Sequence, residues 1–237
     1  HYIEGVRNLI QAVEAGVQLE ALVVSQRLLT SSAARKIIRQ GQQEGVAMLE
    51  LTPEQYRGVS KMERASGVGA VVRQHWTRLH RANPRGGLCW LCLERVRSPG
   101  NLGSLLRSSE ALGGAGLILL GNELDPFDPH MVRATMGSLF SQVLIRTGLS
   151  SLRGWIRRHR CQVVGASPQG RRALHQARFR RPTLFMLGEE RKGLSGAQRN
   201  LVNQELSIPM MGRADSLNLA VAGSLFLYEA QRGHRRM

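Results

Sequence analysis

The stretch Asn101-Leu102-Gly103-Ser104-Leu105-Leu106-Arg107 follows an apolar run and opens a segment with helical spacing. Two further stretches also stand where an apolar run gives way to a Gly-rich or polar turn. They are Leu187-Gly188-Glu189-Glu190-Arg191-Lys192-Gly193-Leu194, and Ile208-Pro209-Met210 with the later Ser216-Leu217-Asn218. Turns of this kind carry the chemistry of open α/β sheets, because ligands bind outside the carboxyl ends of the strands. The three stretches therefore predict an α/β fold with one shared site.

Outward from these stretches, the second part of the chain alternates apolar runs with helical patterns. Strands are expected at 88–93, 116–120, 141–146, 162–166, 182–187 and 206–209, and helices at 102–112, 128–136, 151–160 and 217–232. This alternation is typical of a parallel sheet. We therefore predict a parallel-sheet domain over residues 88–237.

Residues 1–76 alternate in the same way on a smaller scale. Helices are expected at 6–15, from Ser31 or Ser32 onward, and from Thr52, and strands at 21–24, 46–49 and 69–72. Thr52 is suited to cap its helix, and Pro53 is suited to the first turn. We predict a small α/β/α domain at 1–76 and a Pro/Gly-containing linker at 77–87.

The formal net charge of +16 indicates a polyanionic partner or an anionic surface. Arg outnumbers Lys by 30 to 3, which suits bidentate phosphate contacts, although a genomic bias toward Arg codons is an equal explanation for the preference. Residues 1–76 carry a net +2, residues 77–87 a net +3 and residues 88–237 a net +11. The partner is therefore expected to meet the linker and the second part most strongly.

The densest basic region comprises the expected helix 151–160 and the stretch 171–181. Its Arg side chains either contact the phosphates of a polyanionic partner or only keep one helix face solvated. In the first part, Arg7, Arg35, Arg39 and Arg64 are candidates for phosphate contacts, although solvation explains any one of them better.

The sequence contains no apolar run long enough to cross a membrane and no signal peptide, which predicts a cytoplasmic protein. Cys89 and Cys92 form a Cys-x-x-Cys pair inside the expected strand 88–93. Residues i and i+3 of a strand point to opposite faces, so we expect burial in the core rather than a redox or metal pair. The seven His residues show no metal-ligand spacing, and we expect no metal. Glycine-rich dinucleotide and P-loop motifs are absent as well.

Together, and in this order, the three stretches resemble the signature motifs of the SpoU (TrmH) family of the SPOUT superfamily. That family methylates RNA at the ribose 2′-hydroxyl. The resemblance implies S-adenosylmethionine as cofactor, a deep trefoil knot at the C-terminus and a homodimer. It also implies that residues 1–76 are similar to the ribosomal-protein-like RNA-binding domain of members that modify ribosomal RNA.

The resemblance also assigns roles to individual residues. Arg107 would address the ribose 2′-hydroxyl, near the cofactor of the partner chain. Because a guanidinium is a poor base, we expect it to hold a phosphate and to stabilise the developing alkoxide. Glu190 would orient Asn101 or Arg107 or shape the cofactor loop, and Ser216 and Asn218 complete the catalytic set. For Asn101, a helix N-cap is the alternative role, whereas Ser216 could act as an N-cap and in the site at once.

The cofactor would lie among backbone groups and apolar side chains at the three turns. The predicted contacts are Ala166, Leu187, Gly188, Ile208, Met210, Ser216 and Leu217. In the family, Val-Ser usually follows the last Asn, whereas here Leu219-Ala220 stand there. This difference argues against a hydroxyl role at that point and leaves the cofactor site intact.

Three functions compete with methylation of ribosomal RNA. They are ribose methylation of transfer RNA, a catalytically silent RNA-binding or ribosome-assembly factor, and methylation of a base nitrogen. Retention of Asn101, Arg107, Glu190, Ser216 and Asn218 argues against a silent factor. The extra domain at 1–76 favours ribosomal RNA.

Overall fold

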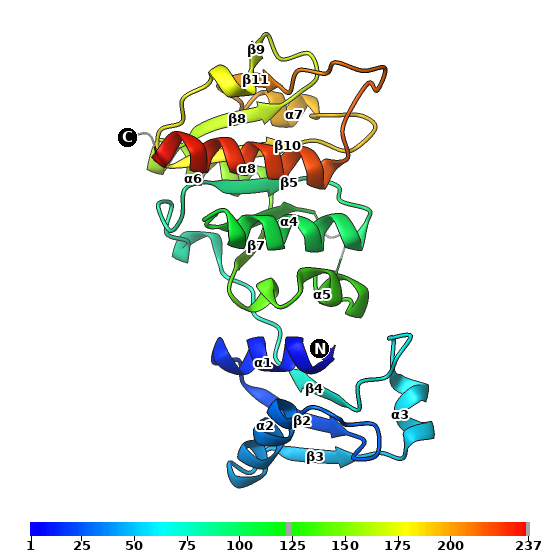
Figure 1. Ribbon diagram of the computed structural model, residues 1–237. Coiled ribbons are helices and arrows are strands. Elements are labelled where there is room, and N and C mark those ends of the chain that lie inside the picture. Colours follow the sequence, from blue (N-terminus) through cyan, green and yellow to red (C-terminus); the bar gives the residue numbers. More distant parts are fainter. Residues whose placement is uncertain (122–124, 236–237) are drawn as a thin grey trace. The chain divides into compact units, whose positions relative to one another are not determined.

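The computed structural model describes residues 1–121 and 125–235 (Figure 1). The chain forms two compact units, each of which draws on two segments. The first comprises His1–His75 with Pro126–Ser141, and the second comprises Trp76–Asp125 with Gln142–Met237. Residues 126–141 thus make their contacts within the first unit, although they lie between two strands of the second in the sequence.

The first unit contains a four-stranded mixed sheet in the order β1-β4-β2-β3. Strand β4 pairs antiparallel with β1 and β2, whereas β2 and β3 are parallel. The strands are β1 (Tyr2–Glu4), β2 (Leu19–Val24), β3 (Ala47–Glu50) and β4 (Val68–Val72). The helices are α1 (Val6–Glu14), α2 (Ser32–Gln43), α3 (Pro53–Val59), α5 (Pro129–Thr135) and the 3-10 turn η2 (Ser138–Phe140). The strand and helix alternation predicted for residues 1–76 is present, with β1 in addition.

Capping explains where two of these helices begin. The Ser31 hydroxyl accepts a hydrogen bond from the Ala34 amide at 3.2 Å. Thr52 and Gln55 cap each other reciprocally at the start of α3, with Pro53 in its first turn. Because each cap satisfies amides that lack a helical partner, the helix starts are fixed by local sequence.

The second unit is built on a seven-stranded parallel sheet in the order β7-β6-β5-β10-β8-β11-β9. The strands are β5 (Trp90–Leu93), β6 (Gly116–Leu120), β7 (Val143–Thr147), β8 (Gln162–Ala166), β9 (Arg172–Ala173), β10 (Thr183–Leu187) and β11 (Gln204–Ser207). The helices are α4 (Pro99–Ala111), α6 (Leu149–His159), α7 (Gly196–Arg199) and α8 (Leu219–Arg235), with 3-10 turns η1 (Leu79–Arg81) and η3 (Leu174–Gln176). The predicted parallel sheet is confirmed.

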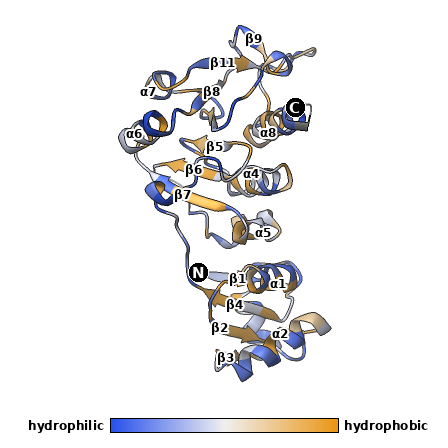
Figure 2. Cartoon of the chain, turned by 90° about the vertical axis from the view of Figure 1, so that its left-hand side faces the viewer, coloured by the Kyte–Doolittle hydropathy of each residue, from blue (hydrophilic) through white to orange (hydrophobic). Residues whose placement is uncertain are grey.

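The central strands β5 and β10 are buried along their whole length, as their continuous apolar sequences predict. Figure 2 shows β6 and β7 in the hydrophobic colour as well. Helices α4 and α8 pack side by side, and α8 also contacts β10 (Figure 1). A Cβ added at Gly223 of α8 would lie 2.5 Å from Leu105 Cδ2, so glycine is what permits this close packing.

The cysteines are buried and free, as predicted for Cys89 and Cys92. Burial raises the pKa of Cys89 to about 12, so the thiol stays protonated near neutral pH. Within the described residues, no group of three His, Cys, Asp or Glu side chains is placed to hold a metal ion. No helix in this part of the chain is long and apolar enough to cross a membrane.

Candidate active site

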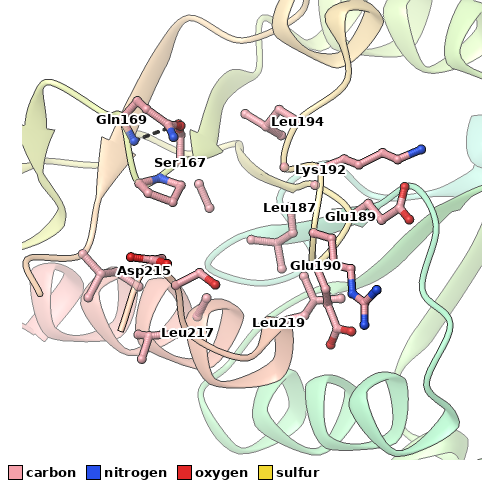
Figure 3. Close-up of a pocket in the computed structure, with 18 of the residues that line it drawn as sticks. Ser167, Gln169, Leu187, Glu189, Glu190, Lys192, Leu194, Asp215, Leu217 and Leu219 are labelled. Carbon is pink, nitrogen blue, oxygen red and sulfur yellow. Dashed lines mark hydrogen bonds between the residues drawn. The ribbon is translucent and has the colours of Figure 1, made fainter. Parts of the chain in front are cut away.

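A cavity of about 320 Å³ lies where β8, β10 and β11 end and α8 begins (Figure 3). Because these strands are parallel, their carboxyl ends meet at one edge of the sheet. The lining includes all seven predicted cofactor contacts: Ala166, Leu187, Gly188, Ile208, Met210, Ser216 and Leu217. Its volume falls in the range of about 300–1,000 Å³ that small-molecule sites occupy.

The loop after β10 closes on itself at Gly188. Glu189 and Gly193 exchange two backbone hydrogen bonds, of 3.0 and 2.8 Å. A Cβ at Gly188 would lie 2.0 Å from the carbonyl carbon of Gly193, and Gly193 itself has φ +66°. The closest neighbour of Gly188 is therefore the chain's own backbone, and both glycines are needed to shape the loop.

An ion pair joins this loop to the one that follows β5. The Arg97 guanidinium lies 2.8 Å from Glu189 Oε1, with 12% of the Glu189 side chain exposed and 69% of Arg97. Strands β5 and β10 are neighbours, so the pair ties together the loops at their carboxyl ends. The sequence alone assigned no role to Glu189, so this ion pair was missed.

A chain of polar side chains connects the three signature stretches. The Asn218 amide donates to Asn101 Oδ1 at 3.0 Å, and the Asn101 amide donates to Glu190 Oε1. Of the two partners predicted for Glu190, the structure therefore selects Asn101. Glu190 lines the cavity, whereas Asn101 and Asn218 line a shallow hollow on the outer side of α4 and α8.

Residues other than Asn101 and Ser216 cap helices α4 and α8. Ser98 caps α4, and its hydroxyl accepts from the Asn101 amide at 3.4 Å, which leaves the Asn101 side chain free for the site. At the start of α8, Asn218 Oδ1 accepts from the amides of Ala220 at 2.8 Å and Val221 at 3.3 Å. The alternative of an N-cap for Asn101 or Ser216 is therefore wrong. Ser216 is left as an exposed lining residue of the cavity.

Arg107 stands apart from the cavity within its own chain. It is exposed on α4, two turns beyond Asn101, and does not line the cavity.

Several lining residues lie outside the predicted set. The turn after β8 contributes Ser167 and Gln169, whose side chains share a 3.0 Å hydrogen bond (Figure 3). Asp215 and Leu219 flank the Ser216–Asn218 stretch. The signal for Ser167 and Gln169 was present in the sequence, because they directly follow a predicted strand that ends in Ala166.

Comparison with known proteins places these features in a family. Residues 89–228 match the model of the SpoU rRNA Methylase family. The chain is 36% identical over 237 residues to the 23S rRNA (uridine(2479)-2′-O)-methyltransferase of Streptomyces viridochromogenes, covering 97% of this chain and 82% of that protein.

Solved structures give the same result. The SpoU methyltransferase AviRb from Streptomyces viridochromogenes, in complex with AdoMet, is 34% identical with a TM-score of 0.88, covering 99% of this chain and 90% of AviRb. The AdoMet-bound rRNA methyltransferase from Sinorhizobium meliloti is 30% identical with a TM-score of 0.88, covering 98% of this chain and 86% of that one. Both similarities extend over the two units.

Proposed function

Because the chain belongs to the SpoU rRNA Methylase family, we propose that it is an S-adenosylmethionine-dependent methyltransferase of a ribose 2′-hydroxyl in ribosomal RNA. The observation that carries the proposal is the polar chain from Asn218 through Asn101 to Glu190, which joins three distant stretches beside one cavity. The ribosomal RNA specificity named for the Streptomyces viridochromogenes relative supports that substrate over transfer RNA. Such a role belongs in the cytoplasm.

The cavity residues suit S-adenosylmethionine, which when bound supplies a methyl group on a positively charged sulfur. Leu187, Ile208 and Leu217 offer apolar surface, and Glu190 and Asp215 place carboxylates in the lining for a cationic ligand. The loop held closed by Gly188 and Gly193 fixes backbone groups at the edge of the cavity. AdoMet-bound structures of two similar proteins support this assignment.

Positioning accounts for much of the rate of such a transfer, since well-oriented reactants gain roughly 7–11 kcal/mol. Hydrogen bonds from Asn101 to Glu190 and from Asn218 to Asn101 fix the relative positions of the three side chains. Asn218 also accepts a hydrogen bond from the Ala220 amide in the first turn of α8. Arg107 stabilises the negative charge that develops on the ribose oxygen as its proton leaves to solvent. Ser216, at the cavity edge, provides a hydroxyl for hydrogen bonding.

A homodimer through the outer face of α4 and α8 accounts for the position of Arg107. That face exposes Val221, Leu225 and Tyr228, with exposed fractions of 47%, 37% and 50%. Ser104 borders the same hollow, and Arg107 lies one turn further along α4. A second copy seated there buries the apolar side chains and brings Arg107 toward the partner's cavity.

Two further parts of the proposal concern the fold. The C-terminal deep trefoil knot is supported by the path of the chain, which leaves β11 near one end of the sheet and returns as α8 against α4 and β10. The first unit serves as the RNA-binding domain. All four of its candidate cations, Arg7, Arg35, Arg39 and Arg64, are exposed, and Arg7 and Arg35 also donate hydrogen bonds to the carbonyls of Met136 and Leu29.

The test is methyl transfer from labelled S-adenosylmethionine to ribosomal RNA and, in parallel, to transfer RNA, with wild type and Arg107→Ala. We expect label in ribosomal RNA, an alkali-resistant linkage at one nucleotide, and loss of transfer in the variant. Tight RNA binding without transfer to either RNA would replace the proposal with a silent binding factor. Label on a base nitrogen would contradict the ribose assignment.

A further inference from the structure

A long part of the sequence, most of it in the second unit, carries no acidic residue. Between Asp128 and Glu189 the sequence contains eleven Arg and no Asp or Glu. A second stretch without acidic residues, between Glu63 and Glu94, includes the linker with Arg78, Arg81 and Arg85.

Six of these Arg precede two neighbouring strands. Arg157, Arg158 and Arg160 end α6 just before β8, and Arg178, Arg180 and Arg181 lead into β10. We call these six residues the amino-edge cluster. Because β8 and β10 are parallel neighbours, with Thr183 opposite Gln162, the residues that precede them lie at the same edge of the sheet. This is the edge opposite the cavity.

Hydrogen bonds hold the segments of the amino-edge cluster together. The Gln162 side chain accepts from the Arg180 amide at 2.8 Å and donates to the Arg178 carbonyl at 3.5 Å. The Arg181 guanidinium donates to the Arg85 carbonyl at 2.6 Å, which adds the linker before β5. The cluster is therefore a property of the folded sheet edge and not of one helix face alone.

The surface of this cluster offers charge without stacking partners. All six Arg are exposed, and among the described residues none of them pairs with a carboxylate. The nearby aromatic rings pack inward: Trp155 is buried, and Phe179 packs edge-on against Phe185 at 5.0 Å. Guanidinium groups without neighbouring aromatic faces suit phosphates rather than unstacked bases.

We propose that the amino-edge cluster is a second RNA-contact surface that binds the phosphate backbone independently of sequence. The inference rests on the proposed function, because it takes RNA as the substrate. A five-residue strand spans about 16 Å, so the cluster meets RNA well away from the nucleotide that is methylated. It therefore contributes to the affinity for a long, folded RNA and not to the transfer step.

The experiment compares Arg178→Gln/Arg180→Gln with wild type and with the matched control Arg57→Gln/Arg73→Gln. The control removes the same charge from two exposed Arg that already pair with Glu54 and Glu20 and that are not among the candidate phosphate contacts of the first unit. Binding to deproteinised large-subunit ribosomal RNA is measured by filter retention over a range of salt concentrations. Methyl transfer to the same RNA gives KM and kcat.

For Arg178→Gln/Arg180→Gln we expect Kd and KM to rise on the order of tenfold, with kcat unchanged. The slope of log K against log salt should fall by about two, one for each lost phosphate contact. The control should match wild type. An unchanged Kd and slope would overturn the proposal, as would a loss seen only with ribosomal particles, which would indicate a protein partner. Absence of methyl transfer in every protein would overturn the proposed function, while the binding data would still decide the cluster.

Discussion

The side-chain amide of Asn101 uses both of its functions, since its nitrogen donates to Glu190 and its oxygen accepts from Asn218. No other side chain type at this position can do both in the same geometry. A carboxylate cannot donate, and an alkyl group can do neither. The positions of the three signature stretches relative to one another therefore depend on the Asn101 side-chain amide.

Asn101→Ala is expected to lower kcat by about 100-fold, because a misplaced group costs that much without any loss of fold. Asn101→Asp should be worse than Ala, since it sets a second carboxylate against Glu190. Single-turnover methyl transfer and thermal unfolding measure the two effects. Asn200→Ala, an exposed Asn at the end of α7, is the matched control. Equal activity of Asn101→Ala and the control would refute the role of this amide.

The ion pair between Arg97 and Glu189 is a second feature that single residues determine. Because Arg97 is mostly exposed, the pair should contribute at most about 1 kcal/mol to stability. Its effect should appear instead in the loop that borders the cavity. Glu189→Gln and Arg97→Gln should each raise the KM for S-adenosylmethionine severalfold at unchanged kcat. The double variant should be no worse than either single one, and strictly additive effects would show that the two side chains act separately.

At the scale of elements, the closed loop after β10 leaves no room for one additional carbon atom at Gly188. In Gly188→Ala the added methyl meets the backbone of Gly193, which cannot move away like a flexible side chain. We expect loss of S-adenosylmethionine binding in calorimetry, with the sheet still folded by circular dichroism. Gly212→Ala, where nothing lies within 4 Å of the added carbon, should bind normally. Normal binding by Gly188→Ala would mean that the loop does not shape the site.

Elements were predictable from sequence where local chemistry decides them. The apolar runs of β5 and β10 and the capping of α3 are examples. The seven residues that the family resemblance predicts as cofactor contacts line one cavity. Features that depend on distant partners were missed. The two-residue strand β9 exists through its pairing with β11, and Ser98 displaces Asn101 as cap one turn earlier than the pattern indicated. The Glu189 role likewise needs Arg97, more than ninety residues away.

At the scale of the whole molecule, three buried thiols make stability depend on alkaline pH. Burial raises the pKa of Cys89 to about 12 and that of Cys161 to about 11, and it raises the pKa of Cys92 further. Above the ordinary value of 9.0, the unfolded chain loses these protons while the folded chain keeps them. The folded state then binds more protons, so stability falls as pH rises.

We therefore expect the free energy of unfolding in urea to decrease between pH 8 and pH 9.5, where the tyrosines of the unfolded chain, with an ordinary pKa of 10.0, ionise less than the thiols. Each thiol contributes at most about 1.4 kcal/mol per pH unit. Cys89→Ala lowers stability at every pH, but it should also make the pH dependence shallower. An identical slope in wild type and Cys89→Ala would exclude the buried thiol as a cause.

The proposed dimer makes the active site a property of two chains, which a mixing experiment tests directly. Arg107→Ala lacks the Arg but has an intact cavity, whereas Gly188→Ala lacks the cofactor loop but retains Arg107. If Arg107 acts at the partner's cavity, a mixed dimer contains one complete site, formed by the intact cavity of one chain and the intact Arg of the other.

Random exchange of equal amounts makes half of the dimers mixed, so about one quarter of all sites should become active in a two-fold symmetric assembly. Each variant alone should be inactive. Tyr228→Glu in both chains places a charge in the apolar face, and it should abolish the recovery and yield monomers in sedimentation. If mixing restores no methyl transfer although wild-type dimers form, Arg107 acts within its own chain. Because Arg107 does not line the cavity of its own chain, the bound RNA would then have to extend from Arg107 to the cavity.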